Sequence, residues 1–182
     1  MTLTESIEID ERIKSRPEYR PLTLLSGKQW QIFIAQNEDQ TGLKQMHEEC
    51  VAIARPGHIV LWVMVGDDLA DSLKLLADAP VAAAVYVAGD EPFLWDIRNA
   101  LLGMDFAPDQ IQLMAPASHR RRLFCTHCYT LTEDVTHSPH RCSGCGELLL
   151  VRDHFSRLHG AYVGVSINAE DRSQTFQPEE VQ

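Results

Sequence analysis

Four of the five cysteines in the 182-residue chain form two Cys-x2-Cys pairs. Cys125 and Cys128 make the first pair, and Cys142 and Cys145 follow after thirteen intervening residues. A Cys-x2-Cys turn directs both sulfurs toward one point, so two such turns that face each other can form a tetrahedral four-thiolate cage. The spacing therefore predicts that these four cysteines bind one metal ion.

Disulfides are the main alternative, and we disfavour them because nothing in the sequence indicates an oxidising compartment. Zn2+ in a closed four-thiolate site is structural, whereas iron in the same cage passes single electrons, as in rubredoxin. Gly144 and Gly146 suit a tight turn around the sulfurs, since glycine tolerates positive φ. Cys142-Ser-Gly-Cys145-Gly146 resembles a rubredoxin knuckle, but Tyr129 stands where a glycine is expected after the first pair. Zn2+ is therefore the favoured ion, with iron in a rubredoxin-like site as the alternative.

Composition indicates a globular protein, with 45% hydrophobic residues and a formal net charge of −10. The negative charge argues against a nucleic-acid partner. Residues 119–160 hold six Arg and four Asp or Glu, a balance of +2, so the rest of the chain carries −12. The basic run His119–Arg122 lacks the interleaved aromatic residues of a base-stacking surface, and we interpret it as a solvated connector.

The N-terminal residues 1–8 are acidic and lack the basic and apolar regions of a signal peptide. No apolar run approaches the roughly 20 residues that a membrane span requires. The sequence therefore predicts a soluble, cytoplasmic protein without a membrane partner.

Near-continuous apolar segments alternate with segments of helical periodicity in the first two thirds of the chain. The predicted strands are Trp30–Ala35, His58–Val65, Ala82–Ala88 and Gln110–Met114. The predicted helices are Leu43–Ala54, Leu69–Leu76 and Pro92–Gly103. This alternation is typical of a parallel sheet that is covered on both faces. The predicted fold class is therefore α/β: a small, Rossmann-like three-layer domain followed by a four-cysteine zinc-ribbon β domain.

Four regions are expected along the chain. Residues 1–21 are expected to form an irregular arm with one short helix around Ile7–Lys14. Residues 22–116 are expected to form the α/β domain. Residues 117–168 form the metal ribbon, and residues 169–182 form a flexible tail. The ribbon's short β segments are Arg122–Phe124, Tyr129–Leu131, Leu148–Arg152 and Ala161–Ile167.

The α/β region resembles the pyridine-nucleotide module of ferredoxin–NADP reductases. The residues that carry this resemblance are Val85–Leu94, the turn Gly103–Ile111, and Ile32–Met46. That family uses a glycine-rich turn, which lets backbone amides approach the pyrophosphate of the nucleotide. Here the turn instead holds Gln36-Asn-Glu-Asp39, and Ala88 stands at the position of the family's reactive cysteine.

These departures indicate a degenerate module. The side chains at 36–39 would obstruct the approach of a phosphate, and two carboxylates would repel it. We therefore interpret the α/β region as a nucleotide fold retained for docking, with residual nucleotide binding at Gln36–Thr41 left open.

The ribbon and the residues after it resemble the small subunit of bacterial dimethylamine monooxygenases, which are haem-dependent oxidative N-demethylases. The resemblance covers about the last third of the chain closely and the α/β region loosely. The residues that carry it are Phe124–Cys128, Leu131–Thr136, Arg141–Gly146, Leu149–Arg157 and Ala161–Val165. It implies a complex that uses reduced nicotinamide and oxygen to convert dimethylamine to methylamine and formaldehyde.

In that family, as the resemblance implies, haem chemistry and flavin or iron–sulfur electron supply belong to partner subunits. Only the four cysteines carry over as site residues. The expected function is therefore that of a non-catalytic structural or assembly subunit. One alternative is a rubredoxin-like electron carrier that feeds a partner oxygenase. Another is a nucleic-acid-binding ribbon, which the negative net charge disfavours.

The remaining polar residues give no catalytic constellation. His127 is expected to point outward from its turn, and the roles of His154 and His159 stay open between an interface and a contact behind the metal site. Cys50 lies on the apolar face of a predicted helix and is interpreted as a small buried hydrophobic residue. Trp62 and Trp95 are expected to anchor a core or an interface.

Overall fold

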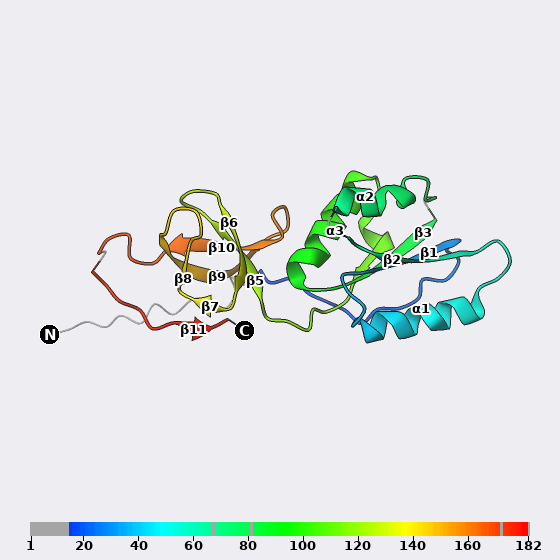
Figure 1. Ribbon diagram of the computed structural model, residues 1–182, viewed down its shortest axis with the longest axis horizontal. Helices are drawn as coiled ribbons and strands as arrows, with labels where there is room; N and C mark the ends of the chain where they lie inside the picture. Colours follow the sequence, from blue (N-terminus) through cyan, green and yellow to red (C-terminus); the bar gives the residue numbers. More distant parts are fainter. Residues whose placement is uncertain (1–14, 67, 81, 172, 182) are drawn as a thin grey trace. The chain divides into compact units, whose positions relative to one another are not determined.

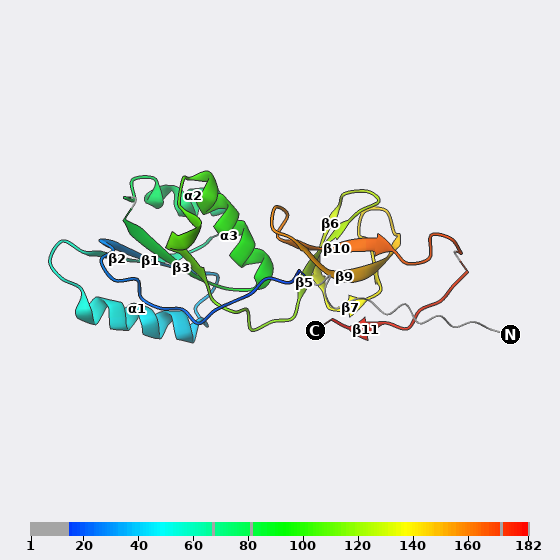
Figure 2. The same ribbon diagram turned by 180° about the vertical axis from the view of Figure 1, so that it is seen from behind.

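The computed structural model describes residues 15–66, 68–80, 82–171 and 173–181. The chain divides into two compact units (Figure 1, Figure 2). One, the α/β unit, is Tyr19–Arg120, and the other, the ribbon unit, contains Arg121–Gln182 and the N-terminal segment that ends at Glu18. The helix predicted at Ile7–Lys14 lies outside the described residues. In the part of the chain that the structure describes, no helix is both long and apolar enough to cross a membrane.

A four-stranded sheet forms the centre of the α/β unit, in the order β2-β1-β3-β4. All its strand pairs are parallel. The strands are β1 (Trp30–Ala35), β2 (Ile59–Met64), β3 (Ala83–Ala88) and β4 (Ile111–Leu113). The predicted α/β class with a parallel sheet is confirmed.

Helix α1 (Thr41–Ile53) covers one face of the sheet, and α2 (Leu69–Leu73) and α3 (Glu91–Gly103) cover the other (Figure 1). Short 3-10 turns follow at Lys74–Leu76 (η2) and Pro108–Gln110 (η3). Helix α3 begins where it does because the Asp90 carboxylate accepts a hydrogen bond from the Phe93 N–H, with Pro92 in the first turn.

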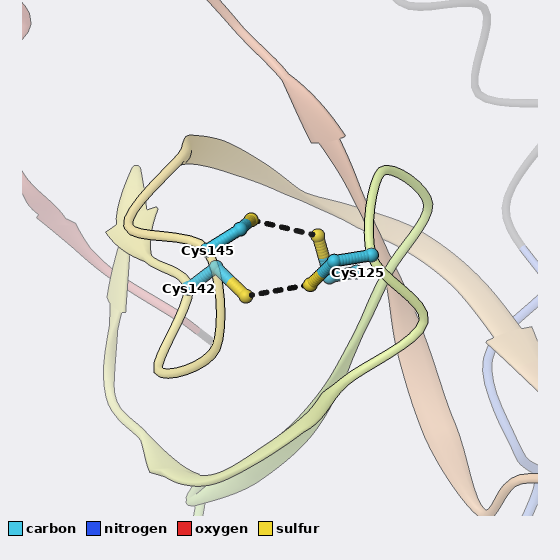
Figure 3. A group of neighbouring side chains, drawn as sticks. Cys125, Cys142 and Cys145 are labelled. Carbon is cyan, nitrogen blue, oxygen red and sulfur yellow. Dashed lines mark hydrogen bonds between the residues drawn. The ribbon is translucent and has the colours of Figure 1, made fainter.

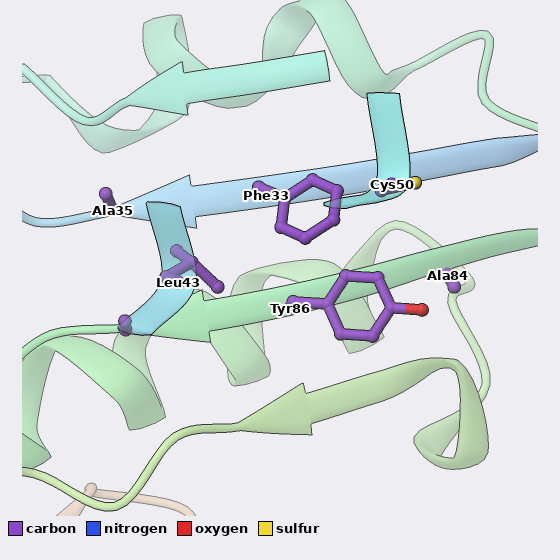
Figure 4. Packing of buried hydrophobic residues seen from close by; sticks show 7 residues of the cluster. Phe33, Ala35, Leu43, Cys50, Ala84 and Tyr86 are labelled. Carbon is purple, nitrogen blue, oxygen red and sulfur yellow. The ribbon is translucent and has the colours of Figure 1, made fainter. Parts of the chain in front are cut away.

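The two faces of the sheet use alternate residues, as strand geometry requires. Phe33 and Tyr86 stack with ring centroids 4.9 Å apart, and they form one buried cluster with Leu43 of α1 (Figure 4). Cys50 belongs to the same cluster and is 5% exposed, and burial raises the pKa of its thiol. Its interpretation as a buried hydrophobic residue is confirmed.

The segment before β1 packs against the α/β unit through specific polar contacts. The Leu25 N–H donates to the Tyr86 hydroxyl at 2.8 Å, and the side-chain amide of Gln112 bonds to both backbone groups of Thr23. The Tyr19 hydroxyl donates to the Glu91 carboxylate at 2.7 Å. Part of the predicted irregular arm therefore belongs to the α/β unit.

Trp95 is buried, as expected, and its indole N–H donates to the Tyr19 hydroxyl. Trp62 is half-buried on β2 beside the ring of His47, with centroids 5.3 Å apart. Both tryptophans therefore pack within the α/β unit.

The ribbon unit is built on a five-stranded sheet in the order β6-β5-β10-β9-β8, in which only β5 and β10 are parallel. Its strands are β5 (Arg121–Cys125), β6 (Leu131–Val135), β8 (His140–Arg141), β9 (Leu148–Ser156) and β10 (Ala161–Ser166). The predicted β-rich C-terminal region is confirmed. In the tail, β11 (Glu179–Glu180) pairs with β7 (His137–Ser138), and the flexibility of the remaining tail stays a prediction.

One ionic network ties the N-terminal segment to the ribbon sheet. The Asp153 carboxylate accepts from Arg16 at 2.7 Å and from Arg121 at 3.1 Å. Arg121 is 4% exposed, and its guanidinium lies 4.0 Å from the ring centroid of Tyr162. The interpretation of the basic run as a solvated connector is therefore wrong for Arg121, because a carboxylate and an aromatic face replace its water.

Replacing Asp153 with Asn should destabilise the ribbon unit by about 1–3 kcal/mol, because it removes the carboxylate charge that pairs with the buried Arg121 guanidinium. Burial raises the pKa of Asp153, but the hydrogen bond and charge of Arg16, together with Arg121, outweigh burial and hold the pKa below its usual value. A depressed pKa stabilises the fold above the unfolded-state pKa of about 3.9, and this stabilisation is lost as the pH falls through the folded value.

Denaturant unfolding of wild type and Asp153→Asn between pH 3 and 7 measures this contribution. The difference in unfolding free energy should be constant near neutrality and shrink below about pH 4. A difference that grows on acidification would contradict the assignment.

Candidate metal centre

The sulfur atoms of the four predicted ligands converge. The Sγ atoms of Cys125, Cys128, Cys142 and Cys145 all lie within 4.8 Å of one another (Figure 3). Cys125 Sγ is 3.9 Å from Cys145 Sγ, and Cys128 Sγ is 3.5 Å from Cys142 Sγ. These distances exclude disulfide bonds of about 2.0 Å and bracket the separation of about 3.8 Å expected between thiolates that share one Zn2+ in a tetrahedron. The donor set therefore fits a single metal ion.

The two turns that present the sulfurs, knuckle 1 (Cys125–Tyr129) and knuckle 2 (Cys142–Gly146), have equivalent backbones. The Tyr129 N–H donates to the Cys125 carbonyl at 2.9 Å, and the Gly146 N–H donates to the Cys142 carbonyl at 3.0 Å. The next bond is also repeated, because Cys125 N–H donates to the Thr130 carbonyl and Cys142 N–H to the Glu147 carbonyl. Each knuckle is thus closed by the same two hydrogen bonds.

Both knuckles end on a residue with positive φ, +64° at Tyr129 and +73° at Gly146. The left-handed conformation suits Gly146, as predicted, but costs a non-glycine residue about 1–2 kcal/mol. Gly144 is needed for a different reason. A Cβ there would lie 2.3 Å from Thr130 Oγ1 and 2.9 Å from Thr130 Cβ, so only glycine lets the knuckles approach this closely.

Neighbouring strands hold each knuckle in place. In knuckle 1, both the backbone N–H and the hydroxyl of Thr126 donate to the Gly164 carbonyl on β10, at 3.0 and 2.9 Å. In knuckle 2, the Ser143 N–H donates to Thr132 Oγ1 on β6 at 3.2 Å. The sheet therefore brings the two pairs of sulfurs together.

The thiols differ in their surroundings. Cys125 and Cys142 are buried, whereas Cys145 is exposed. The hydrogen bonds of the Thr130 hydroxyl and backbone lower the pKa of Cys128 to about 6, so its thiolate is favoured at neutral pH. Burial raises the pKa of Cys125. Thr130, which sequence reasoning missed, is thus a determinant of the site, and its position two residues after Cys128 gave no recognisable signal.

None of the histidines joins the sulfur cluster among the residues that the structure describes. His127 is exposed, as predicted. His154 Nδ1 lies 3.1 Å from the Ser15 hydroxyl. His159 stacks on Phe124, with centroids 4.5 Å apart and planes within 7°. His154 therefore contacts the N-terminal segment, and His159 packs on an aromatic ring.

The turn at Gln36–Asp39 stands where the resembled family has its glycine-rich turn. The side chain of Gln36 reaches from it to the neighbouring turn at Asp90. Gln36 Oε1 accepts from the Asp90 N–H at 2.7 Å, and Gln36 Nε2 donates to the Asp90 carboxylate at 3.0 Å. A Cβ at Gly89 would lie 2.7 Å from Gln36 Oε1, which shows how closely the side chain approaches this turn. The carboxyl ends of β1 and β3, where such folds place a phosphate, are thus bridged by protein groups.

The segment that holds the four cysteines is similar to a known protein family. Residues 122–165 match the family model described as "Dimethylamine monooxygenase subunit DmmA-like, C-terminal domain". Over these 44 residues the chain is similar to that C-terminal domain. All four cysteines lie inside this matched segment, as do both knuckles and most of the five-stranded sheet.

A curated relative is the "Heme-dependent oxidative N-demethylase delta subunit" of Ectopseudomonas mendocina (strain ymp). It is 34% identical over 103 residues, which are 57% of this chain and 59% of the relative. The match therefore spans less than two thirds of the relative's length. No solved structure matches the chain.

Replacing Cys142 with Ser should abolish stoichiometric metal binding and unfold the ribbon unit, because metal binding to such sites is coupled to folding. The α/β unit, with its own core, should keep a separate unfolding transition. Elemental analysis and calorimetry measure the two effects. The matched control is Cys50→Ala, which should retain the metal and lower the stability of the α/β unit by about 1 kcal/mol. Equal metal content in both variants would contradict the assignment of the cage.

Millimolar NADH should leave the Tm of the α/β unit unchanged, because Gln36 and Asp90 bridge the turn that a pyrophosphate would need. A ligand that binds only the folded state stabilises it by RT ln(1 + [L]/Kd), so millimolar NADH would raise the Tm if its Kd were millimolar or lower. Sodium chloride at the same ionic strength controls for ionic effects. A Tm that rises with NADH and saturates would show that nucleotide binding survives at Gln36–Thr41.

Proposed function

We propose that the chain is a non-catalytic structural subunit of a multicomponent dimethylamine monooxygenase, which carries out oxidative N-demethylation of a secondary amine. The observation that carries this proposal is the convergence of four sulfurs within the segment that matches the DmmA-like domain. The relative's name, a delta subunit of a heme-dependent oxidative N-demethylase, supports a complex with further subunits. Those partners are a haem-bearing subunit and flavin or iron–sulfur subunits, and the complex is cytoplasmic.

Zn2+ is the proposed ion, held by Cys125, Cys128, Cys142 and Cys145. Four thiolates close the coordination sphere of Zn2+, which has no redox chemistry, so a bound ion would be structural. Its role would be to link knuckle 1, which follows β5, to knuckle 2, which precedes β9. A rigid ribbon of this kind presents its outer surface to a partner with little loss of conformational entropy.

A rubredoxin-like iron site is the second candidate, and the exposure of Cys145 favours it. A solvent-facing thiolate would place a redox-active iron close to the surface, where electrons could pass to a partner oxygenase. Elemental analysis and an absorption spectrum of one purified sample decide between the ions. One zinc per chain without visible bands supports the structural subunit, and one iron with thiolate charge-transfer bands supports the electron carrier.

Removing the metal should release this chain from the assembled complex, because the ribbon unit loses its fold. Size-exclusion chromatography of the co-purified complex before and after chelation measures the release. The absorption spectrum of the haem subunit should be unchanged, since the haem lies in another chain. A haem subunit that demethylates at its full rate when this chain is absent would contradict an assembly role.

A further inference from the structure

A pocket opens at the amino end of the parallel sheet. Its volume is about 420 Å3, within the range of about 300–1,000 Å3 that is typical of small-molecule sites. The segment before β1, the start of β2 and the C-terminal end of α1 form its walls. Folds of this class bind nucleotides at the carboxyl ends of the strands, so the pocket lies at the opposite end of the sheet from the Gln36–Asp90 bridge.

The inner surface of the pocket is mostly apolar. Leu24, Leu25 and Val60 are half-buried, and Cys50 is 5% exposed. Figure 4 shows Cys50 at the end of the buried cluster where β1 and β3 begin, with the Tyr86 hydroxyl pointing the same way. A hydrocarbon chain or ring would therefore leave water on entering the pocket, which is favourable.

The polar groups behind this surface are hydrogen-bonded to one another. The Tyr86 hydroxyl accepts from the Leu25 N–H at 2.8 Å and donates to Gln31 Oε1 at 2.7 Å. Gln31 Nε2 in turn donates to the Leu25 carbonyl at 2.8 Å. These three bonds hold the segment before β1 against the sheet, so the pocket is preformed and needs no ligand to keep its shape.

The outer part of the pocket is basic. Lys28 is half-buried, and Arg55 and His58 are exposed. Among the described residues, these three side chains have no ion-pair or hydrogen-bond partner. No Asp or Glu of the described part of the chain lines the pocket. The whole chain has 26 Asp and Glu against 16 Lys and Arg, so a pocket with cations and no carboxylate departs from its composition.

The carbonyl end of α1 opposes these cations only in part. Helix α1 ends at Ile53 in the wall of the pocket, and a helix C-terminus is equivalent to about −0.5 elementary charge. Lys28 and Arg55 together carry about two positive charges, and His58 can donate a hydrogen bond in either protonation state. The net field therefore favours an anion, and a cleft lined by one sign of charge concentrates that field.

We propose that this pocket binds a small organic anion, with its apolar body on the inner surface and its carboxylate or phosphate group held by Lys28 and Arg55. Apolar walls with a few polar groups that fix the orientation of the ligand are the usual composition of a small-molecule site. The proposal concerns the α/β unit alone and does not depend on the proposed role as a subunit.

The test titrates the full chain with probes that differ in one feature at a time. Octanoate and octyl phosphate have an anionic group on an octyl chain, octylammonium has a cationic group on the same chain, and acetate lacks the chain. Calorimetry measures the affinities. The backbone amide signals of Gly27 and His58 in NMR spectra locate the site, and Gly89, after β3, is the reference at the other end of the sheet.

Three variants test the cations: Lys28→Gln, Arg55→Gln and the double variant. The matched control is Lys44→Gln, at an exposed lysine of α1 outside the pocket. We expect at least one octyl anion to bind saturably and shift the signals of Gly27 and His58, and octylammonium and acetate to bind at least tenfold more weakly.

Each single variant should weaken binding of the octyl anion about threefold, and the double variant about tenfold, as for partly exposed charges whose contributions add. Lys44→Gln should bind as wild type.

Equal affinity for octanoate and octylammonium would overturn the proposal, because the apolar walls would then bind without help from the cations. Wild-type affinity in the double variant would overturn it as well, and so would the lack of saturable binding by both octyl anions at millimolar concentration. If a short polyglutamate peptide shifts the same amide signals while neither octyl anion does, the pocket receives a polypeptide, and the proposal is wrong.

Discussion

The ribbon unit depends on one geometric constraint, that four sulfurs from two separate turns meet within 4.8 Å. The convergence of the sulfurs requires a defined backbone in both knuckles. The two knuckles repeat the same hydrogen bonds and end in the same left-handed conformation. The same convergence restricts the residues around the sulfurs. Residue 144 must be glycine, because a side chain there would collide with Thr130. The strands that anchor the knuckles are then set by the cage as much as by their own core.

In the α/β unit, a different interaction joins the carboxyl ends of two neighbouring strands. Gln36 and Asp90 join the ends of β1 and β3 through two side-chain hydrogen bonds, in the region where related folds bind phosphate. The parallel sheet therefore closes on protein groups and needs no ligand to satisfy its turns.

Local sequence signals predicted most of this structure. The strands of the parallel sheet and the spacing of the cysteines are periodic or short-range patterns, and the structure confirms the strands and the convergence of the four sulfurs. What the sequence could not show depends on distant partners. Arg121 resembles its neighbours Arg120 and Arg122 in the sequence, yet it is buried because Asp153, thirty-two residues away, lies across the sheet. The Gln36–Asp90 pair, separated by 54 residues, is equally invisible to a local pattern.

Tyr129 shows where local and global requirements conflict. Propensity favours glycine at a position with positive φ, and knuckle 2 has one. A sequence selected only for stability would place glycine in both knuckles, since such sites are where proteins commonly gain stability. Tyr129 is 74% exposed, so burial of its ring does little to offset this backbone cost. The hydrogen bonds that close knuckle 1, from Tyr129 N–H to the Cys125 carbonyl and from Cys125 N–H to the Thr130 carbonyl, hold the backbone in this conformation.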